Sequence, residues 1–398
     1  MAVRLKPAVT TISGSTEVGK TQGPPGRSER MDYERPQFFR VMQYADAASR
    51  DVIDMVSGNP DWEPPGALRE GLIEYAEGDP DQFQYPASEG LLELREEIAA
   101  RRNVDRDQVL VTNGAGEANH LAMAEGLTRG AGDEVILTDP VYPYYAGRTN
   151  LLGGRARYVA VEDDGRLDPD AVREVASEDT ALIVVNSPNN PTGAVYPEAT
   201  IRELVDVAET YDALLVSDEV YDHFDYSGTF TSALAVDSEH RIVTNAVSKS
   251  MAITGFRVGY AIVPEWLVDR FRTRHMLTNV TSSRPAQFAV WRALRETPPD
   301  YYAENRELLR ERIDAFTDAL DAAGAEYTTP EGSFYVMARF PDFSGSMENV
   351  ERLIDEAGVA GMPGAAFGES RADWFRFALV TPRATEAAER LADYFSDG

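Results

Sequence analysis

Residues 246–260 read AVSKSMAITGFRVGY and contain a lysine that is unusual for this chain. The 398-residue chain has 38 basic residues but only three lysines, Lys6, Lys20 and Lys249. Lys6 and Lys20 lie within residues 1–30, a leader rich in Gly, Pro and Ser that we expect to be flexible. Lys249 is therefore predicted to be the only lysine of the folded body. Its presence in a chain that otherwise uses arginine almost exclusively as its basic residue indicates a chemical role.

The composition excludes several kinds of site. With 43% hydrophobic residues, a chain of this length can bury a full core in one large domain or two domains. The absence of cysteine excludes disulfides, thiolate metal sites and a cysteine nucleophile, and four histidines argue against a histidine-rich metal site. We therefore expect no metal.

The charge and hydropathy patterns limit the partners and the location. No stretch approaches 18 continuous apolar residues and the N-terminus lacks an apolar export core, so we expect a cytoplasmic protein without a membrane partner. A net charge of -29 repels phosphate backbones, which argues against nucleic acid as a partner. Excess Asp and Glu with so few lysines is typical of proteins from high-salt cells, where self-repulsion is screened.

Short apolar runs alternate with helical patterns through the middle of the chain. The runs lie at 133–140, 156–162, 180–188, 213–221 and 240–248. This alternation predicts a mostly parallel sheet covered by helices on both faces. After about residue 290 the pattern changes to long helices and a few strands, which predicts a second, smaller α+β domain.

Polar residues close several of the apolar runs. Asn113, Asn190, Asp218 and Lys249 are read as lying at one rim of the sheet, where ligands bind beyond the carboxyl ends of parallel strands. Burial there lowers the pKa of a lysine and makes its amine nucleophilic toward aldehydes. The alternative for Lys249 is an ordinary surface lysine, and the lysine count argues against it.

Each neighbouring candidate also has a structural alternative. Asp218 ends a buried strand, where a carboxylate needs a cationic partner, or else it caps the next segment. Residues 113–123, NGAGEANHLAM, place small residues at a helix N-terminus that could bind phosphate, although such turns are common. Tyr142 could stack on an aromatic ligand or simply pack, and Arg376 in an apolar strand needs an anion from the protein or a substrate.

Taken together, these stretches resemble the fold-type I pyridoxal-phosphate enzymes, and specifically the class I/II aminotransferases related to aspartate aminotransferase. The resemblance covers roughly residues 35–395 and rests on motifs in the order of that family. They are GNPDWEPP, YPASEGLLELREEIA, VTNGAGEA, GDEVILTDPVYPYY, NSPNNPTG, SDEVYDHF, SKSMAITGFRVGY, GSFYVM, PGAAFG and RFALV. The S-K string followed by G-x-R-x-G is the most diagnostic.

The resemblance implies a domain organisation. It implies a seven-stranded, mostly parallel sheet flanked by helices in a large pyridoxal-phosphate-binding domain at 66–290. Residues 31–65 would form an N-terminal arm and part of the small domain, which 291–398 would complete. A homodimer is also implied.

The resemblance further implies roles around the cofactor, pyridoxal 5'-phosphate. Lys249 would form a Schiff base with its aldehyde and would shuttle the proton during catalysis. Asp218 would hold the proton on the pyridine nitrogen, Tyr221 and Asn190 would hydrogen-bond the ring hydroxyl, and Tyr142 would stack on the ring.

The remaining implied roles concern anions. The residues that would hold the phosphate are Ala115, Gly116, Ser248 and Arg257, with Tyr85 reaching in from a partner subunit. Arg376 would bind the substrate α-carboxylate, with Asn190 and the backbone at Gly58 helping to position the substrate. Two positions depart from the pattern: Ala246 stands where many relatives have a serine, and Arg284 is the only candidate for a distal carboxylate, with a structural salt bridge as an equal explanation.

These roles imply ping-pong transamination between an L-amino acid and a 2-oxo acid. A C–S lyase or other eliminating enzyme of the same fold would use the same residues. A ligand-sensing domain of a transcription regulator is the third reading, but the leader is short for a DNA-binding region and the charge is wrong for DNA. The sequence leaves the donor open among alanine, aspartate, aromatic and branched-chain amino acids.

Overall fold

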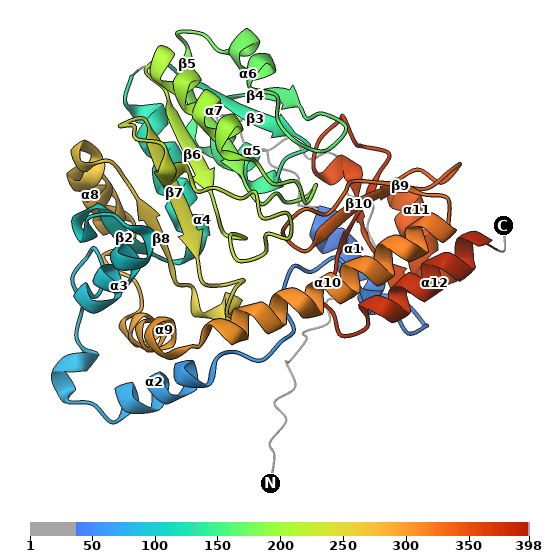
Figure 1. The fold of residues 1–398 in the computed structure, drawn as a ribbon, viewed down its shortest axis with the longest axis horizontal. Coiled ribbons are helices and arrows are strands. Elements are labelled where there is room, and N and C mark those ends of the chain that lie inside the picture. Colours follow the sequence, from blue (N-terminus) through green and yellow to red (C-terminus); the bar gives the residue numbers. More distant parts are fainter. Residues whose placement is uncertain (1–36, 131, 397–398) are drawn as a thin grey trace, which may run out of the picture.

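The computed structural model describes residues 37–130 and 132–396. The leader predicted at 1–30 lies outside these described residues. Figure 1 shows a twisted sheet with helices on both faces and, beside it, a smaller unit built from the two ends of the described chain. The long helix α10 (Pro299–Ala322) runs from one part to the other.

Seven strands form the larger sheet. Their order is β2-β8-β7-β6-β5-β3-β4, and every strand is parallel to the others except β8, which pairs antiparallel with both β2 and β7. The strands are β2 (Val109–Thr112), β3 (Glu134–Asp139), β4 (Arg155–Ala160), β5 (Thr180–Asn186), β6 (Leu214–Asp218), β7 (Arg241–Ala246) and β8 (Gly259–Ile262). The seven-stranded, mostly parallel sheet expected from the sequence is confirmed.

The central strands β5 and β6 are buried along their whole length because helices cover both faces of the sheet. In β5, Ile183 and Val185 belong to the same apolar cluster as residues of α7 (Glu198–Thr210). The alternate residues, Leu182 and Val184, belong to the cluster that contains residues of α4 (Gly114–Thr128). A strand buried on both faces reads as a continuous hydrophobic run, which is the pattern in the sequence.

The other helices surround these two layers and the smaller unit. The α-helices are α1 (Gln37–Ala47), α2 (Gly66–Ala76), α3 (Leu92–Arg102), α5 (Pro143–Leu152), α6 (Pro169–Val175), α8 (Val268–Asn279), α9 (Arg284–Glu296), α11 (Met347–Arg352) and α12 (Ala384–Ser396). The short 3-10 helices are η2 (Pro80–Phe83), η3 (Arg106–Gln108), η4 (Ala233–Ala235), η5 (Thr254–Phe256), η6 (Glu265–Leu267) and η8 (Gly364–Ala366). η7 (Leu353–Ala357) is a short π-helix. None of the helices in the described part of the chain combines the length and the apolar character of a membrane span.

The smaller unit has its own sheets and its own core. A four-stranded antiparallel sheet has the order β12-β13-β10-β9, and β1 pairs with β11 in a separate parallel pair. These strands are β1 (Ile53–Asp54), β9 (Glu326–Tyr327), β10 (Tyr335–Arg339), β11 (Val359–Ala360), β12 (Met362–Pro363) and β13 (Phe375–Ala378). One apolar cluster joins Val41, Ile53, Met55 and Val56 to residues between Ile313 and Leu391. The cluster on the larger sheet extends to Leu294 on α9.

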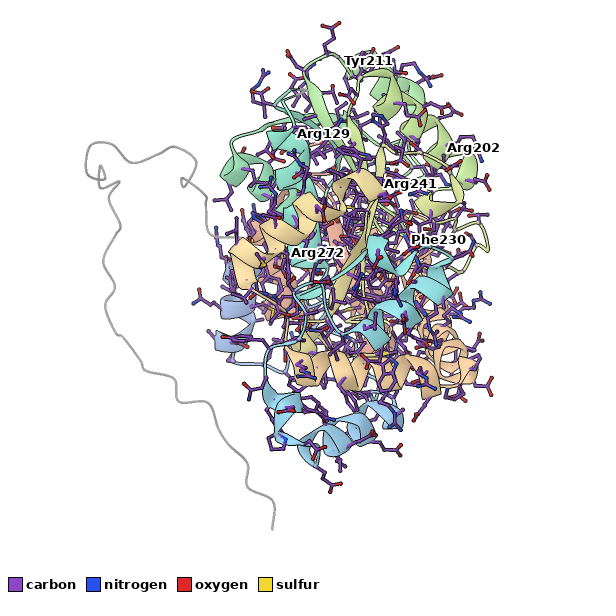
Figure 2. All side chains as sticks on the ribbon, turned by 90° about the vertical axis from the view of Figure 1, so that its left-hand side faces the viewer. Arg129, Arg202, Tyr211, Phe230, Arg241 and Arg272 are labelled. Atoms are coloured by element: carbon purple, nitrogen blue, oxygen red, sulfur yellow. The ribbon has the colours of Figure 1, made fainter. Side chains whose placement is uncertain are left out.

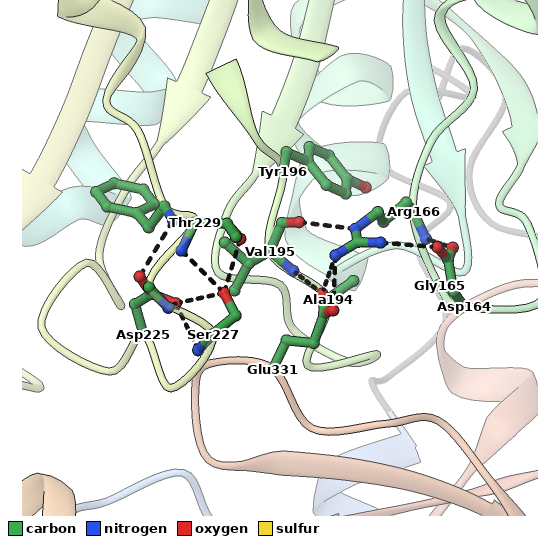
Figure 3. Close-up of polar contacts among 12 residues, drawn as sticks. Asp164, Gly165, Arg166, Ala194, Val195, Tyr196, Asp225, Ser227, Thr229 and Glu331 are labelled. Atoms are coloured by element: carbon green, nitrogen blue, oxygen red, sulfur yellow. Dashed lines mark hydrogen bonds and ion pairs between the residues drawn. The ribbon is translucent and has the colours of Figure 1, made fainter. Parts of the chain in front are cut away.

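A loop of the smaller unit is fixed to loops of the larger sheet (Figure 3). Both carboxylate oxygens of Glu331 accept hydrogen bonds of 2.6 Å from Arg166 Nη2, and the Val195 amide donates to the same carboxylate at 3.3 Å. The amides of Gly332 and Ser333 donate at 2.8 Å to the carbonyls of Gly193 and Phe224 respectively. These contacts fix the beginning of β10 beside the loop that follows β5.

Arginines on the surface are paired largely with carboxylates. On the face in Figure 2, Arg202 of α7 pairs with Glu198, and Arg129 pairs with Asp212 at 2.7 Å. In contrast, a few arginines at the carboxyl ends of the strands have no carboxylate partner in the described chain, and these arginines line the site described next.

Candidate active site

A pocket of about 610 Å³ lies at the carboxyl ends of the parallel strands. The polar residues that end β5 and β6, Asn186 and Asp218, line it, and so does Lys249, which follows β7. The smaller unit contributes residues of β10 and β13, including Tyr335 and Arg376. The pocket is therefore closed by side chains from both parts of the fold, at the rim predicted from the sequence.

Lys249 is buried in this pocket. Its Nζ donates a hydrogen bond of 2.6 Å to the carbonyl oxygen of Gly58, and it has no carboxylate partner in the described chain. Burial lowers the pKa of Lys249, and the positive charges of Arg376 and Arg257 lower it further. A larger fraction of this amine is therefore neutral at a given pH than of an ordinary lysine, and a neutral amine can attack an aldehyde.

Asp218 is the buried carboxylate at the end of β6. Its Oδ2 accepts hydrogen bonds of 2.6 Å from both Asn119 Nδ2 and the Tyr145 hydroxyl, and its Oδ1 accepts one of 3.1 Å from the Val220 amide. Burial raises the pKa of Asp218, and within the described chain no cationic side chain forms an ion pair with it. The cationic partner expected from the sequence is thus not supplied by these residues, which fits a ligand that brings its own positive charge.

Two tyrosines face each other beside Lys249. The hydroxyls of Tyr221 and Tyr335 are 3.3 Å apart, and burial raises the pKa of Tyr221 well above its usual value, so its hydroxyl remains protonated. A Cβ on Gly58 would overlap the Tyr335 hydroxyl and would lie 3.6 Å from Lys249 Nζ. Only a glycine at this position lets the backbone come so close to both side chains.

Arg376 lies on β13 and is buried. Its Nη1 donates to Asn190 Oδ1 at 3.4 Å and its Nη2 donates to the Val56 carbonyl, while its Nε has no hydrogen-bond partner among the described residues. The guanidinium lies 4.5 Å from the centre of the Tyr335 ring. It forms no ion pair with a carboxylate among the described residues. A buried guanidinium with unused donors fits a carboxylate ligand.

Asn190 corrects one detail of the sequence interpretation. The sequence placed Asn190 at the end of the strand, but β5 ends at Asn186, and Asn190 lies four residues later in the turn. The strand stops because Pro188 has no N–H to continue the ladder. Asn190 still lines the pocket. Its backbone N–H donates a hydrogen bond of 2.8 Å to Asn186 Oδ1, which holds the turn against the end of β5.

The first turn of α4 and Arg257 form a cradle for an anion. Ala115 and Gly116 of this turn line the pocket, and helix N-termini carry free amides and a positive dipole. The guanidinium of Arg257 donates to the carbonyls of Thr254 and Asn113 at 2.9 and 3.1 Å, which hold it against this turn. Among the pocket-lining residues of the S-K string, Ser248 carries a hydroxyl and Ala246 does not.

The remaining predicted residues divide between the pocket and the outer surface. Tyr142 lines the pocket, and its ring centre lies 5.6 Å from that of Tyr145. Tyr85 is 82% exposed and lies outside the pocket of its own chain. Arg284 also lies outside, where it donates to the carbonyls of Asp81 and Gln84 rather than forming the salt bridge considered above.

Among the pocket residues that sequence reasoning missed are Asn119, Tyr145, Arg148 and Tyr335. Asn119 is a polar residue within the small, apolar stretch of α4, which was a usable signal. Tyr145 and Tyr335 lie within quoted motifs, but their contacts with Asp218 and Tyr221 depend on the tertiary fold. No group of three or more potential ligand side chains able to hold a metal occurs in the part of the chain that the structure describes.

Comparison with known proteins shows the family to which this chain belongs. Residues 50–394 match the family model described as aminotransferase class I and II. A probable aspartate/prephenate aminotransferase of Thermus aquaticus is 34% identical over 357 residues, which cover 86% of this chain and 91% of the relative. An aromatic-amino-acid aminotransferase 2 of Thermococcus litoralis is 30% identical over 92% of this chain and 97% of its own length.

Solved structures show the same fold. Aspartate aminotransferase from Thermus thermophilus with maleate superposes with a TM-score of 0.84 at 30% identity, covering 93% of this chain and all of the other. An aromatic aminotransferase from Pyrococcus horikoshii gives a TM-score of 0.82 at 29% identity, covering 90% of this chain and 99% of the other. The chain therefore belongs to the class I and II family of pyridoxal-phosphate-dependent aminotransferases.

Proposed function

We propose that this enzyme moves the amino group of an L-amino acid to a 2-oxo acid by a ping-pong reaction in the pocket around Lys249. One observation carries the proposal: a buried lysine and a buried aspartate face the same pocket without protein counter-ions. Burying two such groups is costly unless a ligand uses them. Arg257 and Arg376 offer two further unpaired cations for the anionic groups of a cofactor and a substrate.

The pocket residues fit pyridoxal phosphate. When bound, this cofactor supplies an aldehyde that combines with amines and a ring that accepts electrons. Lys249 would hold the aldehyde, and Asp218 would pair with the protonated ring nitrogen, whose positive charge would offset the cost of burying this carboxylate. Asn190 and Tyr221 would hydrogen-bond the ring hydroxyl, and Tyr142 would stack on the ring. The phosphate would be held by Ala115, Gly116, Ser248 and Arg257.

Catalysis then depends on the position and protonation of two side chains. The guanidinium of Arg376 binds the α-carboxylate of the substrate, with Asn190 and the Gly58 backbone beside it, and this fixes the α-carbon near Lys249. Once the substrate amine has replaced Lys249 on the aldehyde carbon, the freed, neutral amine of Lys249 would take the proton from the substrate α-carbon and deliver it to that former aldehyde carbon. A base already in place, with a lowered pKa, is suited to this transfer.

The substrate side of the pocket is largely apolar. Phe38, Val56, Met362 and Phe367 line it together with Arg376. The relatives named above are described as acting on aspartate, prephenate or aromatic amino acids. For this chain we propose an L-amino acid donor and a 2-oxo acid acceptor, with the donor to be identified by the assay below.

A homodimer completes the proposed site. Tyr85 is 82% exposed in one chain, and apolar side chains near it are exposed as well, among them Ile73 at 60% and Phe83 at 56%. Exposed apolar groups around a residue assigned to the phosphate support an interface through which Tyr85 reaches the partner's pocket. Sedimentation at assay concentration tests this, because an active monomer would contradict it.

The remaining features of the proposal concern organisation and setting. We assign 66–290 to the large domain, 31–65 to an N-terminal arm and part of the small domain, and 291–398 to the rest of the small domain. The apolar cluster on the larger sheet continues to Leu294. The acidic composition supports a cytoplasmic protein from a high-salt cell.

The reaction is tested by mixing the purified holoenzyme with single amino acids and no oxo acid. An aminotransferase converts its bound cofactor to pyridoxamine phosphate once per site, and the fastest amino acid identifies the donor. Repeated ammonia release with unchanged cofactor would instead identify an eliminating enzyme. Binding without any product would identify a sensor.

A further inference from the structure

Arg148 is a pocket-lining cation without a role in the site as proposed. It lies on α5, and its Nη1 is buried without a hydrogen-bond partner among the described residues. Its guanidinium forms no ion pair in the described chain, and its contact with an aromatic ring is a distant one, 5.9 Å from the centre of Tyr144. In a chain with 67 acidic residues, a half-buried arginine with no carboxylate partner calls for an anion.

The first turn of α4 shows which part of the pocket Arg148 reaches. The point at which Gly116 would carry a Cβ lies 3.4 Å from Arg148 Nη2 and 4.0 Å from Arg257 Nη2. Two guanidinium groups from different elements therefore approach one point beside the amides of α4. Like charges so placed repel each other unless an anion lies between or beside them.

Neighbouring groups also experience the positive charge of Arg148. Burial lowers the pKa of His120, and the charge of Arg148 lowers it further. Burial raises the pKa of Tyr142, while the charge of Arg148 opposes this rise. The charge of Arg148 thus acts on Tyr142, which lines the pocket, and on His120 of α4.

We propose that Arg148 is a second arginine for the cofactor phosphate and binds it together with Arg257. This inference rests on the proposed cofactor site. A phosphate monoester carries close to two negative charges at neutral pH, so two arginines balance it where Arg257 alone does not. Arg257 is held by backbone carbonyls on one side of Gly116, and Arg148 reaches the same glycine from α5.

The test compares two ligands that differ only in the phosphate. Apoprotein is titrated with pyridoxal phosphate and with pyridoxal, for the wild type, Arg148→Gln and Arg202→Gln. Arg202 is a matched control because it lies on the surface of α7 and pairs with Glu198. We expect Arg148→Gln to reduce the preference for the phosphorylated ligand by about 10- to 100-fold, the range for a charge-assisted hydrogen bond, with little change for pyridoxal. Arg202→Gln should retain the full preference.

The possible outcomes separate this inference from the proposed function. If the wild type binds neither ligand, the proposed cofactor site fails. If the wild type prefers the phosphate and Arg148→Gln keeps that preference, Arg148 does not bind it and the inference is overturned. Equal losses for both ligands would show a structural role and would overturn it too. A raised KM for dicarboxylic amino acids with an unchanged phosphate preference would assign Arg148 to the substrate instead.

Inorganic phosphate provides a second measurement that needs no intact cofactor. It should compete with pyridoxal phosphate for the wild-type apoprotein, and Arg148→Gln should weaken its inhibition constant by a similar factor. Thermal melting of the two apoproteins checks that both are folded. Unchanged competition by phosphate in a folded variant would contradict the proposal.

Discussion

The side-chain nitrogen of Lys249 lies 2.6 Å from the carbonyl oxygen of Gly58 and donates a hydrogen bond to it. Lys249 follows the central strand β7, whereas Gly58 follows β1 of the smaller unit. The single lysine of the described chain is thus held at the junction of the two parts.

Lys249→Ala should abolish turnover while leaving noncovalent cofactor binding, because Arg257, Asp218 and Tyr142 remain. Loss of a positioned base alone reduces rates by about 100- to 10,000-fold. Borohydride treatment followed by peptide mapping should attach the cofactor to the peptide containing Lys249 in the wild type and to no peptide in the variant. Covalent attachment at Lys6 or Lys20 would refute the assignment.

The reactivity of Lys249 should depend on pH in a direction set by its lowered pKa. Because burial lowers this pKa below the ordinary 10.5, the amine becomes neutral at a lower pH than a free lysine does. The rate at which apoprotein captures pyridoxal phosphate should rise as pH rises through the lowered pKa and level off before 10.5. Nα-acetyl-lysine, which keeps a free ε-amine, serves as the reference. If the midpoint of the pH–rate curve of the protein lay at or above that of the reference, the effect of burial would be disproved.

Asp218→Asn preserves the size of the side chain and removes its charge. We expect turnover to fall by about 100-fold or more, since the ring nitrogen loses the partner that keeps it protonated. Cofactor affinity, measured by equilibrium dialysis, should fall much less. Wild-type turnover in this variant, or in Asp218→Ala, would show that Asp218 is only a structural cap.

Gly58→Ala should reduce activity because the added methyl group overlaps the Tyr335 hydroxyl next to Lys249. A displacement of about 1 Å at a reacting group can lower the rate by roughly 100-fold. Gly66→Ala is the matched control, since a Cβ there meets nothing within 4 Å. Comparison of kcat for the two variants checks the prediction, and equal values would contradict it.

Salt should stabilise the protein. With 67 acidic against 38 basic residues, charge repulsion is strong at low ionic strength and is screened as salt rises. The melting temperature of the apoprotein should therefore increase between low and molar KCl. A melting temperature that falls over this range would argue against the high-salt interpretation.

The sequence predicted the parts of this fold that depend on local pattern. The runs that became β3, β5, β6 and β7 are rich in apolar residues because these strands are buried on both faces of the sheet, so their positions could be predicted from the sequence. The reversed direction of β8 could not be predicted from the sequence, because the short buried run GYAI carries no signal of the direction in which the strand runs. The β1–β11 pair joins Ile53 to Val359 and has no local signal at all.

The site, too, could be predicted only where the sequence carries a local signal. Lys249 was found because it is the only lysine outside residues 1–30, and Asp218 because a carboxylate is costly at the end of a buried strand. Asn190 was misplaced by four residues because its strand ends at the earlier asparagine, before Pro188. Arg148 was not found, because an arginine on a helix is ordinary until the structure shows that it has no partner.

The length of helix α10 enlarges the effect of any change in its direction. Its 24 residues span about 36 Å at 1.5 Å per residue. Its first turn lies beside the core of the larger sheet, where Tyr302 packs, and its later turns belong to the core of the smaller unit. A change of direction of about 5° at the first turn would displace the far end by about 3 Å over that length. A small displacement caused by a substitution where α9 meets α10 therefore becomes larger at the smaller unit. A substitution remote from the pocket can in this way shift Arg376.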